Sequence, residues 1–302
     1  MSIKDIMETN KNQNKDNSHS NKIYKKKLSS GFELPVLGIG TYTFGGEHET
    51  DYSNDKEWIS AIKTALDLGY THIDTAEIYG SGHTEELVGK AIEGYEREKL
   101  FITTKVYKTN LRYDDVLKSA QESLRRMKIN YIDLHLIHSF NPDIPLKETI
   151  LAMNELVKKG LVRYIGVCNF SISQLKEAQK HSKVKIINNQ MKYKIWSETK
   201  PDIKKPNIKT FEYCQKNNIM ITAYKIFGRS KIKTDKIPLI SEIAKKYNKN
   251  DAQVIINWIA SKKNFVMIFM SMNKNHLKEN IDALKFTIDK QDIQKLDDSF
   301  LK

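Results

Sequence analysis

Apolar residues along this chain alternate between short continuous runs and segments in which they recur every three or four positions. Between the runs, a spacing such as that of Val116, Ala120 and Leu124 predicts amphipathic helices. The runs themselves predict eight strands, at residues 36–42, 72–75, 101–105, 131–138, 162–167, 185–190, 219–224 and 265–270. Strict alternation indicates parallel strands with helical crossovers. Eight such units in about 280 residues predict an α/β fold, a closed (β/α)8 TIM barrel.

An open doubly wound sheet is the alternative arrangement of alternating strands and helices. It requires a GxGxxG turn between its first strand and a helix. Here Gly38 and Gly40 are followed by Thr43 in place of the third glycine, and no helix pattern follows at once. The closed barrel is therefore the better prediction.

The N-terminal part of the chain has two further features. A turn at Ser30 and Gly31 between two short extended segments predicts a β-hairpin in front of the barrel. Residues 1–22 are polar and contain no apolar run, so we expect a disordered tail rather than a secretory signal or transit peptide. The chain thus divides into this tail and one barrel domain over residues 23–302.

Charge and composition narrow the function classes. The 50 basic and 37 acidic residues give a net charge of +13, but only six of the basic residues are Arg and the lysines alternate with acids. We therefore expect no specific nucleic-acid binding. No apolar run approaches the length of a membrane span, which is about 18 residues. Two isolated cysteines, Cys168 and Cys214, fit a cytoplasmic protein with reduced thiols.

Polar residues stand at the ends of seven predicted strands. In a parallel barrel the active site lies at the carboxyl ends of the strands. Each residue has an ordinary structural role when taken alone, such as capping a loop or a hydrogen-bonded place in the core. Burying seven polar side chains would cost free energy without stabilising the core, so together these strand ends predict that they line one pocket. They are Asp74, Lys105, His138, Asn169, Gln190, Tyr224 and Ser271.

The same positions lie within longer motifs. GYTHIDTAEIYGSGHTEELVGKAI at 69–92 and GLVRYIGVCNF at 160–170 are the most specific of them. With these motifs, residues 32–301 resemble the aldo-keto reductases. The resemblance implies an NAD(P)H-dependent enzyme that reduces small aldehydes or ketones, with a catalytic tetrad of Asp74, Tyr79, Lys105 and His138. It implies no metal, and His135 and His138 face opposite sides of a strand, so they cannot share one.

The residue types in this tetrad suit carbonyl reduction. The nicotinamide supplies a hydride, and the protein supplies orientation and a proton. A free Tyr has a pKa of about 10, and a nearby ammonium lowers it. We expect Lys105 to act in this way on Tyr79, the proton donor, while Asp74 holds Lys105. His138 would orient the carbonyl oxygen.

The resemblance also implies cofactor contacts. It assigns the nicotinamide carboxamide to Asn169 and Gln190, and stacking on the nicotinamide ring to Tyr224. The remaining contacts are Thr41 and Tyr42 beside the cofactor, the backbone of Phe227 and Gly228 at the pyrophosphate, and Ser271, Glu279 and Asn280 at the adenosine end.

Four positions depart from the family pattern. Met270 and His276 stand where a Lys and an Arg usually bind the 2′-phosphate of NADP. Cys168 stands where Ser is usual, and Lys225 replaces a common Ser after Tyr224. NADP(H) remains the first expectation, with NAD(H) also usable. The alternative function is a cofactor-binding regulatory or redox-sensing protein on the same barrel, against which the intact tetrad argues.

Overall fold

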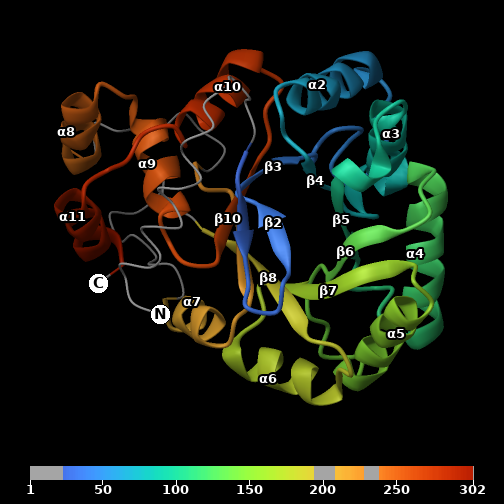
Figure 1. The fold of residues 1–302 in the computed structure, drawn as a ribbon. Coiled ribbons are helices and arrows are strands. Elements are labelled where there is room, and N and C mark those ends of the chain that lie inside the picture. The colour runs from blue at the N-terminus through green and yellow to red at the C-terminus, as the bar shows by residue number, and fades with distance from the viewer. Residues whose placement is uncertain (1–22, 194–207, 228–237, 302) are drawn as a thin grey trace.

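The computed structural model describes residues 23–193, 208–227 and 238–301 (Figure 1). Eight parallel strands close into a barrel in the order β10-β3-β4-β5-β6-β7-β8-β9. This confirms the predicted (β/α)8 barrel, and each strand falls within about two residues of its predicted range. The strands are β3 (Leu37–Gly40), β4 (His72–Asp74), β5 (Phe101–Val106), β6 (Ile132–Ile137), β7 (Val162–Cys168), β8 (Ile186–Lys192), β9 (Met220–Tyr224) and β10 (Phe265–Phe269).

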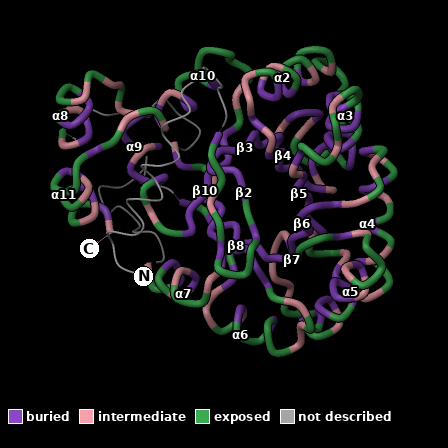
Figure 2. Tube along the Cα trace, viewed as in Figure 1, coloured by how far each residue is buried: buried purple, intermediate pink, exposed green. Residues whose placement is uncertain are grey.

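Helices surround the barrel and expose one side to solvent, while the strands are buried (Figure 2). Ser171 and Gln174 form a capping box at the start of α6, and Asn250 and Gln253 form a second one at α9. The helices in the described part of the chain are α2 (Asp55–Asp67), α3 (His83–Ile92), α4 (Tyr113–Met127), α5 (Leu146–Lys158), α6 (Ile172–His181), α7 (Ile208–Lys216), α8 (Pro238–Tyr247), α9 (Asp251–Ala260), α10 (Lys274–Asp282) and α11 (Lys290–Phe300), with short 3-10 turns η1 (Tyr79–Gly82) and η2 (Arg97–Lys99).

The predicted hairpin closes one end of the barrel. Its strands β1 (Lys25–Lys27) and β2 (Glu33–Pro35) pair antiparallel. Leu28, Phe32 and Leu34 are buried in one apolar cluster with side chains of five barrel strands. Lys26 Nζ donates hydrogen bonds to the carbonyls of Ala260 and Lys262, just before β10 begins. The hairpin therefore covers the amino ends of the strands and leaves the carboxyl ends for a site.

Two expectations concern the tail and membrane spans. The expected disordered tail, residues 1–22, lies outside the residues that the structure describes. Within the described ranges, no helix is long and apolar enough to cross a membrane.

Candidate active site

Asp74 and Lys105 form a buried ion pair at the carboxyl ends of β4 and β5. Lys105 Nζ donates to Asp74 Oδ1 at 2.7 Å and to the carbonyl of Thr75 at 2.7 Å. It also lies 3.5 Å from Tyr79 Oη. Both charged side chains are almost completely excluded from solvent. Because a buried ammonium needs nearby acceptors, this arrangement fixes Lys105 against the Tyr79 phenol.

A run of left-handed backbone places Tyr79 above this pair. Gly80, Ser81 and Gly82 follow it with φ of 53°, 52° and 97°. A Cβ on Gly80 would lie 2.2 Å from the Gly45 carbonyl oxygen, so only glycine fits there. The turn folds the chain back directly after β4, which brings the Tyr79 ring into the mouth of the barrel.

The pKa of Tyr79 differs from the sequence expectation. Burial raises it to about 12, Lys105 lowers it, and Asp74 raises it again. Lys105 thus acts in the expected direction, but the loss of hydration and the Asp74 charge outweigh it. The phenol consequently carries its proton at neutral pH. Burial alone would lower the pKa of Lys105, but Asp74 and Tyr79 hold it above its usual range, so the ammonium stays charged.

His138 follows β6 and meets Tyr79 edge to face, with ring centroids 5.6 Å apart. Burial, with a contribution from Lys105, lowers its pKa to about 3. The imidazole is therefore neutral, and one nitrogen can carry a hydrogen to donate. Its Nδ1 atom is buried and has no hydrogen-bond partner among the described residues.

Two further residues, for which the sequence predicted no role, lie beside these rings. Tyr107 lies edge-on to His138, at 5.9 Å between ring centroids. Glu77 accepts hydrogen bonds from the Tyr107 amide at 2.5 Å and from Asn110 Nδ2 at 3.0 Å, and also from Ser119. Its carboxylate ties the turn that carries Tyr79 to the segment after β5. The position of Glu77 inside the motif at 69–92 was the available signal.

The proposed carboxamide ligands lie at the same mouth. Gln190 Nε2 donates to Asp74 Oδ2 at 2.6 Å, which joins β8 to β4 across the barrel. Asn169 Nδ2 donates to Tyr224 Oη at 3.0 Å. Thr41 is buried and donates through Oγ1 to the Asp74 carbonyl at 3.0 Å. Six of the seven predicted strand-end residues therefore lie in two contact groups at this end.

The seventh, Ser271, belongs to a separate part of the rim. Its Oγ accepts a hydrogen bond from the Asn273 amide at 3.1 Å and shapes the turn before α10. Glu279 is exposed on α10, whereas Asn280 is buried and interacts with Tyr70. Gly228 lies outside the described residues, and its neighbour Phe227 stacks on Phe269 at 5.3 Å.

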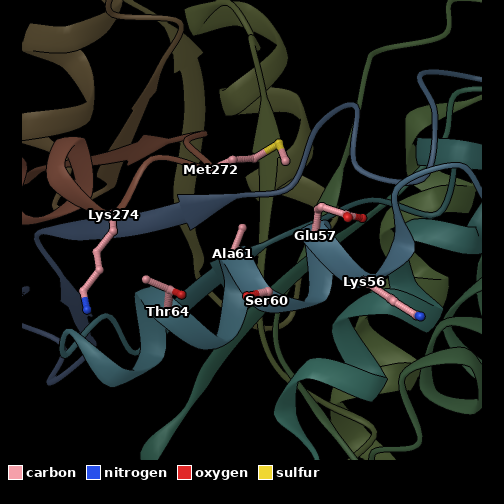
Figure 3. A pocket seen from close by; sticks show the side chains of 7 residues that line it. All are labelled: Lys56, Glu57, Ser60, Ala61, Thr64, Met272 and Lys274. Carbon is pink, nitrogen blue, oxygen red and sulfur yellow. The ribbon is translucent and has the colours of Figure 1, made fainter.

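A surface groove of about 460 Å³ runs between this turn and α2 (Figure 3). Met272 and Lys274 form one wall, and α2 residues including Ser60 and Thr64 form the floor. The groove is distinct from the tetrad. Met272 in this groove and Met270, two residues before it, are each half exposed, and the charged side chains of Lys56, Glu57 and Lys274 also line the groove.

Comparison with known proteins agrees with this geometry. The model of the aldo/keto reductase family matches residues 36–300. Glyoxal reductase from Bacillus subtilis is 32% identical over 273 residues, covering 90% of this chain and 91% of that protein. Methylglyoxal reductase from Escherichia coli is 34% identical over 264 residues, covering 86% and 90%.

Solved structures give the same result. A thermostable aldo-keto reductase crystallised with the inhibitor epalrestat superposes with a TM-score of 0.84 at 42% identity, covering 91% of this chain and 99% of that one. An aldo/keto reductase from Klebsiella pneumoniae in complex with NADP and acetate gives 0.77 at 25% identity, covering 92% and 95%. The chain therefore belongs to the aldo/keto reductase family and is an NAD(P)H-dependent oxidoreductase that reduces carbonyl groups.

Proposed function

We propose that Asp74, Tyr79, Lys105 and His138 are the catalytic residues of this reductase, and that its substrates are small aldehydes and ketones, including dicarbonyls. The observation that carries the proposal is the Lys105 ammonium held between Asp74 and the Tyr79 phenol, with a neutral His138 ring beside it. The relatives named above are reductases of glyoxal and methylglyoxal, which supports the substrate class. They also favour the enzyme over the regulatory alternative.

Tyr79 and His138 act on the same carbonyl oxygen of the substrate in different ways. His138, neutral at pH 7, donates a hydrogen bond that orients this oxygen. Tyr79 Oη then gives its proton to the same oxygen as negative charge develops on it. The phenolate that remains is stabilised by the Lys105 ammonium, whose own position is fixed by Asp74. When bound, the reduced nicotinamide cofactor supplies the hydride to the carbonyl carbon.

The amides at the mouth fit a nicotinamide cofactor. Gln190 uses its nitrogen on Asp74, which leaves its Oε1 as an acceptor for a carboxamide N–H. Asn169 Nδ2 donates one hydrogen bond to Tyr224 Oη and has a second N–H to donate. The Tyr224 ring is half-buried, with its hydroxyl held by Asn169, and offers a fixed flat surface for the nicotinamide ring.

NADP(H) is the preferred cofactor in this proposal, with only a weak preference over NAD(H). Family members bound to NADP support the first part. Met270 has no charge and His276 is exposed, so neither supplies a fixed cation for the 2′-phosphate. Thr41, Tyr42, Phe227 and the adenosine-end residues Ser271, Glu279 and Asn280 complete the proposed cofactor contacts.

The substitution Tyr79→Phe tests the assignment of the proton donor. It removes only the phenolic oxygen, so we expect kcat for reduction of methylglyoxal to fall by roughly three orders of magnitude or more. The dissociation constant of NADPH, measured by calorimetry, should remain nearly the same. Tyr164→Phe is the control because Tyr164 packs on Phe32 at the closed end of the barrel. A Tyr79→Phe enzyme with near wild-type kcat would refute the assignment.

A further inference from the structure

Glu77 lies two residues before the proton donor, where the pairing between β4 and β5 ends. The amides of Thr75 and Glu77 donate to the carbonyls of Thr103 and Lys105, at 2.8 and 3.3 Å, so this pairing continues past the last residue of β4. In a regular parallel ladder the next amide, that of Tyr107, would donate to the backbone carbonyl of Glu77. Here the side-chain carboxylate of Glu77 accepts it instead, at 2.5 Å. The backbone can therefore leave the sheet and enter η1 while the end of β5 keeps its partner.

The same carboxylate accepts two further hydrogen bonds. Asn110 Nδ2 donates to Glu77 Oε1 at 3.0 Å, and the Ser119 hydroxyl on α4 donates to Oε2. Burial raises the pKa of this carboxyl, and its hydrogen bonds offset part of the rise. Within the described ranges, no hydrogen bond joins the carboxylate to a side chain of the tetrad. Glu77 can therefore affect the reaction only through the residues that it holds in place.

The residues that Glu77 joins are neighbours of three members of the tetrad. The proton donor follows Glu77 in the chain, and the Lys105 carbonyl accepts the Glu77 amide directly. Tyr107 packs edge-on against the His138 ring. The His138 amide also donates to the Val106 carbonyl at 2.9 Å, so the backbone at the end of β5 sets the place of this imidazole too. A shift between Glu77 and the Tyr107 amide would thus move the proton donor relative to both the ammonium and the imidazole.

We propose that Glu77 is a positioning residue for carbonyl reduction, whose carboxylate fixes Tyr79 relative to Lys105 and His138. This inference rests on the proposed function, because it takes Tyr79 to be the proton donor. The three groups that donate to the carboxylate are uncharged, so the reach of the side chain matters and its charge does not. A displacement of about 1 Å in an active site can slow the chemical step by about a hundredfold, so a difference of one methylene should be measurable.

Two conservative variants separate reach from charge. Glu77→Gln keeps the length: its amide oxygen can accept from Tyr107 and Asn110, and its NH2 group can donate to the Ser119 hydroxyl. Glu77→Asp keeps the charge but is one methylene shorter. We expect Glu77→Gln to reduce methylglyoxal with a kcat close to that of the wild type, and Glu77→Asp to lose about tenfold or more in kcat. The dissociation constant of NADPH should change little in either variant. Both are assayed well below their melting temperatures, which circular dichroism determines.

Asp133→Glu is the matched control, because the buried Asp133 carboxylate accepts the Ile102 amide at 2.9 Å, at the other end of β5. It should lower the melting temperature and leave kcat unchanged. Near wild-type kcat in Glu77→Asp would overturn the proposal. A lower kcat in Glu77→Gln than in Glu77→Asp would also overturn it and assign the effect to charge, and an equal loss in the control would assign it to destabilisation. If Tyr79→Phe abolishes turnover while Glu77→Asp does not lower it, this inference alone fails and the proposed function stands.

Discussion

The Tyr79 phenol keeps its proton through the neutral range because its pKa is raised to about 12. Reduction consumes that proton, so its rate should stay level from about pH 6 to pH 9. Oxidation of the alcohol needs the phenolate, whose fraction grows about tenfold per pH unit below the pKa. We therefore expect oxidation to accelerate steadily over this range. Measured kcat profiles in both directions check this, and an oxidation rate that levels off near pH 8 would contradict it.

Met270 gives a second prediction at the level of one side chain. The wild type should favour NADPH over NADH by only about tenfold in kcat/KM, equivalent to ~1.4 kcal/mol. Met270→Lys places a cation at the rim and should increase this ratio at low salt, with a smaller effect at high salt. The measurement is kcat/KM for both cofactors at two salt concentrations. A wild-type preference above about a thousandfold would show that other residues bind the 2′-phosphate well.

The turn η1 orients the proton donor Tyr79, and its backbone conformation requires glycine at position 80. Gly80→Ala places a methyl group 2.2 Å from the Gly45 carbonyl oxygen, so the turn must shift and carry Tyr79 with it. We expect both kcat and the melting temperature to fall. Gly94→Ala is the control: its φ is 88°, but a methyl group there meets nothing within 4 Å. It should destabilise by about 1 kcal/mol and leave kcat unchanged. Equal kcat values for the two variants would contradict this role for the turn.

Elements of the barrel could be predicted because their signals are local. Apolar runs located all eight strands of the barrel. Relations between distant elements could not be predicted in this way. Gln190 bonds Asp74 across 116 residues, and Lys225 reaches Tyr42 past an intervening strand. The pKa of Tyr79 is a balance between burial and two opposite charges, which depends on distances that spacing alone does not give.

For the molecule as a whole, buried histidines should limit stability in acid. Burial lowers the pKa of His135 to about 4, and neither of its ring nitrogens has a hydrogen-bond partner among the described residues. In the unfolded chain the pKa is about 6.5, so below that pH the unfolded state binds a proton that the folded state does not. Stability contributed by the neutral ring is therefore lost as pH falls from about 6.5 to 4, by up to roughly 3 kcal/mol.

The variant His135→Leu removes this titration and two buried polar atoms. We expect it to be more stable than the wild type at pH 8, and by a larger margin at about pH 5. Urea unfolding at both pH values measures the difference. His72 and His138 also have lowered pKa values and remain in the variant, so part of the acid sensitivity should persist. An identical pH dependence in the two proteins would exclude His135 as a contributor.

The hairpin that closes the barrel has a consequence for how the chain is made. Leu28, Phe32 and Leu34 leave the ribosome early, yet the cluster that buries them includes Val266, and β3 pairs with β10. Contacts between such distant parts of a sequence form slowly. During translation the apolar cluster around these side chains cannot be completed until β10 emerges. The hairpin is thus synthesised before the barrel strands but is among the last elements to reach its native place, and the nascent protein depends on that interval being kept free of aggregation.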